Sequence, residues 1–144
     1  MPGKGHFLMG IRQHVDEWLA AHGETVIGWR RHFHTHPELS HQERHTTEFI
    51  TTVLREHGMT PTLFPTTGLM VDIGPGVGPR IAFRADLDAL PIEETAPVAF
   101  RSASPGVMHA CGHDVHTAIV LALACALNTY PLTVGLRFIF QPAE

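Results

Sequence analysis

The sequence predicts an α/β fold in which helices surround a mostly parallel or mixed central sheet. In the N-terminal third of the chain, apolar residues recur at helical spacing. The spacing changes to the alternation typical of strands in residues 69–85, and an apolar helical run at 118–127 precedes an apolar strand at 133–140. This order of helices and strands is typical of a sheet that helices cover.

Two helices are predicted at the start of the chain. The segment from His6 to about His34 carries apolar residues at helical spacing, and Gly23 is expected to break it into two helices. Pro37 ends the second of them, because the residue before a proline is pushed out of the α region.

The residues "SHQE" predict the start of the next helix. Ser40 is the expected N-cap, and Glu43, three residues later, is its reciprocal partner in a capping box. This helix is expected to end near Gly58 and Pro61, since glycine closes helices in the left-handed conformation and proline cannot continue them.

Alternating residues predict strands at Leu69–Ile73 and Arg80–Ala85, joined by "GPGVGP" as a hairpin or tight loop. This loop does not match a phosphate-binding loop, because no Lys-Ser/Thr pair and no helix follow it. A helix is expected from about Val115 to Leu127, and Asp114 is well placed to cap its N-terminus. The apolar strand Thr133–Phe140 follows.

Length and composition limit the possible functions. A chain of 144 residues with 44% hydrophobic content can bury one sizeable core, and its net charge of −4 includes no basic stripe for nucleic acid. The longest apolar run, Ala118–Leu127, is about half of the roughly 20 residues that span a bilayer. No secretory signal is evident, so a cytoplasmic location is expected. Two cysteines are too few for a disulfide scaffold, and Cys125 is expected to be a small buried hydrophobe.

Polar residues follow the predicted strands, where ligands bind in α/β sheets. Asp86 and Asp88 follow a strand at a spacing of two, which places both carboxylates on one side. Cys111 and His113 precede a predicted helix, and Glu144 follows the last strand. These five residues are the candidates for a functional site.

Some of these residues, and two histidines near them, also have structural interpretations. Asp86 and Asp88 are as compatible with a structural role, as a turn residue and a surface carboxylate, as with a functional site. His116 lies one helical turn beyond His113, so a shared metal is geometrically possible, although a role in the core or behind the ligands is preferred. His109 is interpreted in the same way.

The pair formed by Cys111 and His113 leaves three interpretations open. Gly112 between them lets the backbone turn tightly, and thiolate and imidazole are both good ligands for zinc-like metals. Two ligands do not make a site, however, and no CxxC or HExxH pattern supplies the others. A cysteine at a helix N-terminus beside a histidine is also a candidate nucleophile. Spacing alone does not choose among a metal site, a nucleophile and a structural role.

Four motifs occur in order between about Glu24 and the last residue: "RRHFHTHPELSHQE", "FRADLDALPIEE", "MHACGHDVHTA" and "FQPAE". Together they resemble the N-terminal part of the metal-dependent amidohydrolases that include hippurate hydrolase, bacterial N-acyl-amino-acid amidohydrolases and plant auxin-conjugate hydrolases. The resemblance implies a zinc-peptidase-like catalytic domain that hydrolyses the amide bond of N-acyl amino acids.

The resemblance also implies roles for the candidate residues. Two divalent metal ions, manganese or zinc, would activate the attacking water, with Cys111 and His113 as metal ligands. Glu144 matches the general base, and Asp88 matches the aspartate that orients a metal ligand in related metallopeptidases. Asp86 stands where those relatives have a histidine ligand and is not expected to bind metal.

The resemblance implies a second glutamate paired with Glu144, further histidine ligands, and a lid and dimerisation domain, and residues 1–144 do not contain them. Residues 1–144 are therefore expected to form the N-terminal portion of the catalytic domain, without measurable amidase activity and with weak metal binding. The last strand, Thr133–Phe140, is expected to expose an apolar edge, since later strands that would cover it are missing.

The expected partner is a small-molecule N-acyl amino acid, and neither nucleic acid nor a membrane is expected. The sequence selects neither the acyl group nor the amino acid, and the intact form is compatible with a homodimer or a homotetramer. An alternative of another class is a non-catalytic metal-binding or interaction module that uses Cys111, His113 and His116.

Overall fold

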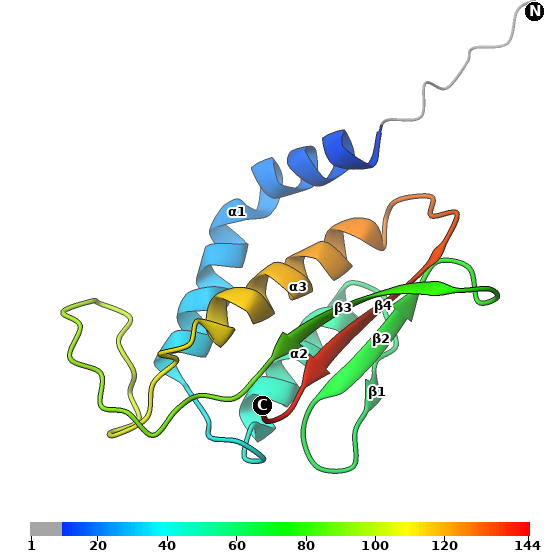
Figure 1. Cartoon of the computed structure of the whole chain (residues 1–144). Helices are drawn as coiled ribbons and strands as arrows, with labels where there is room; N and C mark the ends of the chain where they lie inside the picture. The colour runs from blue at the N-terminus through cyan, green and yellow to red at the C-terminus, as the bar shows by residue number, and fades with distance from the viewer. Residues whose placement is uncertain (1–9) are drawn as a thin grey trace, which may run out of the picture.

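The computed structural model describes residues 10–144, which form one four-stranded mixed sheet and three helices (Figure 1). The elements in chain order are α1 (Ile11–Thr35), α2 (Arg44–Glu56), β1 (Thr62–Leu63), β2 (Leu69–Ile73), β3 (Arg80–Asp86), α3 (His113–Leu127) and β4 (Gly135–Gln141). The predicted α/β fold is confirmed. The first residues of the helix predicted from His6 lie outside the described residues.

The strand order is β1-β2-β4-β3, with β2 antiparallel and β3 parallel to β4. Phe138 of β4 lies opposite Val71 on one side and Phe83 on the other. The uncovered edge predicted for this strand is therefore wrong, because β4 is paired on both sides. Of the two alternatives for "GPGVGP", the hairpin is wrong, because β4 separates β2 from β3, and residues 74–79 form a loop between the two strands. Local alternation identifies strands but does not determine which strands pair.

The core lies between the helices and one face of the sheet. Residues alternate along β4 between buried and half-buried, as expected when one face is covered. The helix α3 runs between α1 and the sheet, and α2 lies behind the strands in the view of Figure 1. The largest buried apolar side chains are Phe33, Ile50, Leu54, Leu69, Val71, Leu87, Leu121, Phe138 and Phe140. Cys125 is buried among them as predicted, and burial raises the pKa of its thiol to about 12.

The first helix is continuous, so the predicted break at Gly23 is wrong. A glycine inside a helix costs about 1 kcal/mol relative to alanine. Here Val15, Trp18 and Val26 pack against the core on both sides of the glycine, and this packing outweighs the local preference. The helix ends at Thr35, just before Pro37, as predicted.

The capping box predicted at "SHQE" is also wrong. Glu43 is itself the N-cap residue of α2, its side chain makes no cap hydrogen bond, and Ser40 lies before the helix. The carboxylate of Glu38 caps the helix instead and accepts hydrogen bonds from the N–H groups of His45 (3.1 Å) and Thr46 (2.8 Å). The side chains of Ser40 and Glu43 therefore make their contacts outside the helix.

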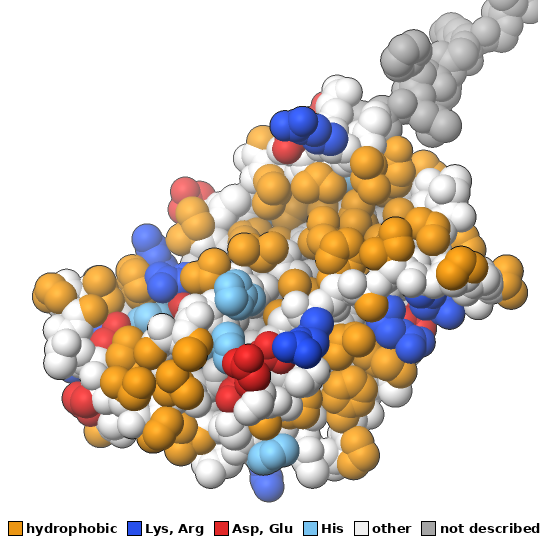
Figure 2. Space-filling model, viewed as in Figure 1, with side chains coloured by type: hydrophobic (Ala, Val, Ile, Leu, Met, Phe, Trp, Pro, Cys, Tyr) orange, Lys and Arg blue, Asp and Glu red, His pale blue; other side chains and the backbone are white. Residues whose placement is uncertain are grey.

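Hydrophobic side chains gather on the surface of α1 and α3 (Figure 2). Leu19 and Ile27 of α1 and Val115 and Ile119 of α3 are exposed. An apolar cavity of about 220 Å³ lies between the two helices. No helix within residues 10–144 is both long enough and apolar enough to cross a membrane.

Gly68 lies where the segment before β2 meets the end of β4. Its φ is +79°, and a Cβ there would lie 2.6 Å from the Phe140 carbonyl oxygen and 2.6 Å from Cδ of Pro142. Gly68→Ala is expected to lower the free energy of unfolding by about 2–4 kcal/mol. The cost of a left-handed backbone at alanine adds to the cost of the steric clash between its Cβ and these two atoms. Urea denaturation measures the loss.

Gly58→Ala is the matched control for this prediction. Gly58 has a similar φ of +77°, but nothing lies within 4 Å of the Cβ position. The control is expected to lose only about 1–2 kcal/mol from backbone strain. Equal losses in the two variants would show that the close contact at Gly68 is unimportant.

Candidate metal centre

Three side chains with metal-ligand atoms meet at one edge of the sheet. Asp86 ends β3, Glu144 follows β4, and His113 begins α3. One ligand atom from each lies within 4.8 Å of the others, and Nε2 of His113 is 3.3 Å from Oε2 of Glu144. Figure 1 shows the C-terminus beside the start of α3. The structure thus brings together three of the five candidate residues, including Asp86, which was not expected to bind metal.

The topology explains this meeting. Because β3 and β4 are parallel neighbours, with Asp86 opposite Gln141, the residues that follow them leave the sheet at the same edge. Gly112, the N-cap of α3, has a φ of 84°, a left-handed conformation that glycine adopts readily. The tight turn predicted between Cys111 and His113 is present.

The ring of His113 is held from one side. Its Nδ1 lies 2.8 Å from the backbone carbonyl oxygen of Asp88 and 3.3 Å from the carboxylate oxygen Oδ1 of the same residue. A hydrogen bond from Nδ1–H to the carbonyl leaves the lone pair of Nε2 available to a metal. The backbone carbonyl and the carboxylate of Asp88 thus both lie near Nδ1 of His113. The role of Asp88 as an orienting aspartate stays a prediction.

The side chains fit a divalent metal ion. Oxygen Oδ1 of Asp86 is buried and has no hydrogen-bond partner within residues 10–144. A buried carboxylate oxygen without a partner is costly, and a cation beside it would remove this cost. Carboxylate oxygen together with imidazole nitrogen suits both manganese and zinc. Asp86, which the sequence did not predict as a ligand, is thus a candidate.

Two predicted residues lie apart from this group. Cys111 is exposed, and its thiol does not belong to the group formed by Asp86, His113 and Glu144. His116 is exposed on α3, with its ring centroid 6.1 Å from that of His113, so a role in the core is wrong, while a role behind the ligands stays a prediction. The role of Cys111 as a metal ligand stays a prediction.

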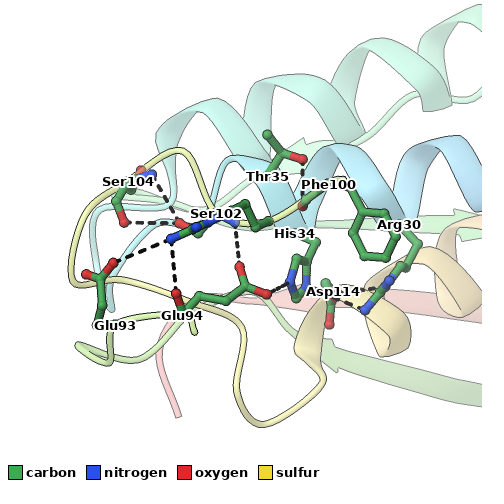
Figure 3. A network of polar contacts seen from close by, with 10 residues as sticks. Arg30, His34, Thr35, Glu93, Glu94, Phe100, Ser102, Ser104 and Asp114 are labelled. Atoms are coloured by element: carbon green, nitrogen blue, oxygen red, sulfur yellow. Dashed lines mark hydrogen bonds and ion pairs between the residues drawn. The ribbon is translucent and has the colours of Figure 1, made fainter. Parts of the chain in front are cut away.

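Asp114, the residue after His113, is one of two buried carboxylates that His34 joins (Figure 3). Nδ1 of His34 is 2.8 Å from Oδ2 of Asp114, and its Nε2 is 2.8 Å from Oε1 of Glu94. The guanidinium of Arg30 also approaches Oδ2 of Asp114, at 2.8 Å. Burial alone would raise the pKa of Glu94, but hydrogen bonds from His34 and from the Ser102 N–H hold it below its usual value.

This network corrects the prediction that Asp114 caps α3. The helix begins at His113 with Gly112 as its N-cap, and no side chain forms a cap hydrogen bond. The buried carboxylate of Asp114 bonds to His34 on α1 instead and ties the two helices together beside His113. Sequence reasoning missed this contact because the two residues are 80 positions apart and no local pattern links them.

His109 is a second buried histidine beside the centre. It is 5% exposed, and neither ring nitrogen has a hydrogen-bond partner within residues 10–144. Burial lowers the pKa of His109 to about 4, although Asp114 opposes the shift, and the nearby His34 and His113 lower it further. His109 is therefore a neutral buried imidazole near pH 7.

His109 is expected to make the protein acid-sensitive. Its folded pKa of about 4 lies below the ordinary 6.5, so the unfolded state binds more protons and stability falls as the pH falls through this window. The free energy of unfolding is expected to fall by about 3 kcal/mol between these two pH values. Urea denaturation with a chelator present measures this slope, which should flatten in His109→Gln and persist in His116→Gln. An unchanged slope in His109→Gln would contradict the assignment.

The comparisons with known proteins agree with these observations. Residues 82–144 match the model of peptidase family M20/M25/M40. The chain is 50% identical over 126 residues to an N-acetyl-L-cysteine deacetylase of Bacillus subtilis, a match that covers 84% of the chain and 30% of that protein. It is 47% identical over 138 residues to an N-acyl-L-amino acid amidohydrolase of Geobacillus stearothermophilus, covering 93% of the chain and 36% of that protein.

The fold also matches the crystal structure of the YXEP protein of Bacillus subtilis, described as a dinuclear metal binding peptidase from the M20 family. The TM-score is 0.82 at 45% identity, over 87% of this chain and 36% of that one. The chain thus spans about a third of the length of these three relatives. Residues 82–144 thus match peptidase family M20/M25/M40, and the chain is similar in sequence and in fold to about a third of an M20 peptidase.

Proposed function

We propose that this chain supplies part of the active site of an amidohydrolase that cleaves N-acyl amino acids with water activated at two divalent metal ions. The observation that carries the proposal is the 3.3 Å approach of Nε2 of His113 to Oε2 of Glu144, with the Asp86 carboxylate in the same group. The names of the two enzyme relatives support the substrate class, and the dinuclear relative supports two ions.

The chain's own residues divide the work of hydrolysis. His113, Asp86 and Cys111 would hold metal, and a divalent ion supplies a Lewis acid that polarises the scissile carbonyl and lowers the pKa of a water molecule. Glu144 accepts a proton from the attacking water and returns it to the leaving nitrogen as the C–N bond breaks. The products are a carboxylic acid and a free amino acid. Asp88 keeps the His113 ring in place through Nδ1.

We also propose that residues 1–144 alone do not turn over substrate and bind metal weakly. A catalytic zinc ion usually has about three protein ligands and a water. Within residues 10–144 the group of ligand atoms comes from Asp86, His113 and Glu144, and Cys111 is the further candidate. This set is too small for two ions.

The His113 imidazole is expected to be essential for metal binding by residues 1–144. In a Co²⁺ titration followed by absorption, His113→Ala should lose binding, because Nε2 is the imidazole ligand in the group. A thiolate-to-cobalt band that Cys111→Ser removes would identify Cys111 as a ligand. His116→Ala, which removes an exposed imidazole on the same helix, is the control and should bind like the unaltered chain. Full binding by His113→Ala would overturn the assignment of the centre.

A chimera tests the activity. Residues 1–144 replace the matching part of the Geobacillus stearothermophilus amidohydrolase, to which they are 47% identical over 138 residues. With Mn²⁺ or Zn²⁺, the chimera is expected to release the free amino acid from N-acetyl amino acids, while residues 1–144 alone release none. A folded, metal-loaded chimera without hydrolysis, or turnover by residues 1–144 alone, would count against the proposals.

A further inference from the structure

Two strained backbone positions meet at one buried carboxylate. Within residues 10–144, His41 (φ 63°) and Ala143 (φ 51°) are the non-glycine residues with positive φ. Each donates its N–H to the same oxygen, Oε1 of Glu43, at 3.0 Å. A left-handed residue with a Cβ is unfavourable and persists where its surroundings hold it. The Glu43 carboxylate thus stabilises the left-handed conformation at both His41 and Ala143.

The Glu43 side chain is not required by its own helix. It is fully buried, at 0% exposure, and Oε2 accepts a hydrogen bond of 2.6 Å from the Thr67 hydroxyl. Glu38 caps α2 in its place. Burying a carboxylate is costly unless it is well hydrogen-bonded, and the three donors to Glu43 come from His41, Thr67 and Ala143. The buried charge therefore links the start of α2 to the end of the chain.

Ser40, from the same "SHQE" stretch, reaches the same segment through Asp88. The Ser40 hydroxyl donates a hydrogen bond of 2.8 Å to Oδ2 of Asp88, and the Glu144 N–H donates to the same oxygen at 3.4 Å. The other carboxylate oxygen of Asp88 faces His113. Consecutive N–H groups, those of Ala143 and Glu144, are thus anchored by two buried carboxylates.

We propose that Glu43 is a positioning residue that fixes Ala143 in its left-handed conformation and so directs the Glu144 carboxylate toward Nε2 of His113. Rotation about the Ala143 backbone would swing the following side chain, so the anchor determines where that carboxylate lies. Ser40 supports the same arrangement through Asp88. The catalytic consequence rests on the proposed role of Glu144 as general base, whereas the anchoring does not.

Amide hydrogen exchange in metal-free residues 1–144, followed by NMR, tests the anchoring. In Glu43→Ala the exchange rate of the Ala143 amide is expected to rise about tenfold or more, because its acceptor is gone. Glu43→Gln keeps an oxygen for both N–H groups, and the Thr67 hydroxyl can turn to accept from the new amide, so protection should be largely retained.

Glu38→Ala is the matched control for the exchange experiment. It removes another carboxylate that accepts backbone N–H groups at the same helix end, whereas the N–H groups of residues 143 and 144 donate to Glu43 and Asp88. It should leave exchange at Ala143 unchanged. Equal exchange in Glu43→Ala and Glu38→Ala would overturn the proposal. If Glu43→Ala does not fold, the unaltered chain decides, because an unprotected Ala143 amide there also overturns it.

Kinetics of the metal-loaded chimera test the catalytic consequence. Glu43→Ala is expected to lower kcat about 10- to 100-fold with KM unchanged, because a small misplacement of a catalytic group has effects of this size. Glu43→Gln should restore most of kcat, and Glu38→Ala should keep it. Equal losses in the Glu43→Ala and Glu38→Ala variants would overturn the positioning role. An inactive parent chimera would count against the proposed function, while hydrogen exchange would still decide the anchoring.

Discussion

Glu144→Gln is expected to lower kcat for an N-acetyl amino acid about 10²- to 10⁴-fold in the chimera, the range for loss of a general base. Glutamine has nearly the same shape as glutamate, but its amide does not take a proton from the attacking water. Because its oxygen can stay near Nε2 of His113, which is 3.3 Å from the carboxylate, metal binding is expected to persist. Initial rates and a Co²⁺ titration on the same protein measure the two effects.

The control for this prediction is Glu93→Gln, which neutralises an exposed carboxylate outside the group of ligand atoms. It should leave kcat unchanged. Retained turnover in Glu144→Gln would show that another group accepts the proton. Inactivation by alkylation of Cys111, together with indifference to chelators, would instead favour the cysteine-nucleophile interpretation.

Phe138→Ala is expected to lower the free energy of unfolding by about 3–5 kcal/mol, the usual loss for a large aromatic side chain in a core. Phe138 is 0% exposed on the central strand β4, and its ring stacks on Phe83 with centroids 5.3 Å apart. Truncation would leave a cavity between the sheet and the helices. Urea denaturation of residues 1–144 measures the loss.

Ile81→Ala on the neighbouring strand β3 is the matched control. Ile81 is 52% exposed, so its truncation is expected to change the free energy of unfolding by only about 0.5 kcal/mol. Similar losses in both variants would show that β4 is not the centre of the sheet.

Local periodicity was sufficient to locate most of the elements. Alternation over Leu69–Ile73 predicted β2 with its observed bounds, and Pro37 marked the end of α1. These features depend on residues close together in the chain, where spacing alone decides which face is apolar. The pairing of β4 between β2 and β3, by contrast, joins residues far apart in the chain, so local spacing does not predict it. Local spacing also does not predict that α1 continues through Gly23, because tertiary packing maintains the helix there.

For the site, the sequence by itself determined the set of chemical groups and placed His113 at the start of a helix and Glu144 after a strand. Their motifs lie at strand and helix ends, which parallel pairing brings together. Only the tertiary structure decided that Asp86 joins them, that His34 holds Asp114, and that Glu43 anchors the chain end instead of capping a helix. The reason is physical: a buried polar side chain must find partners, and packing decides which distant groups lie within reach.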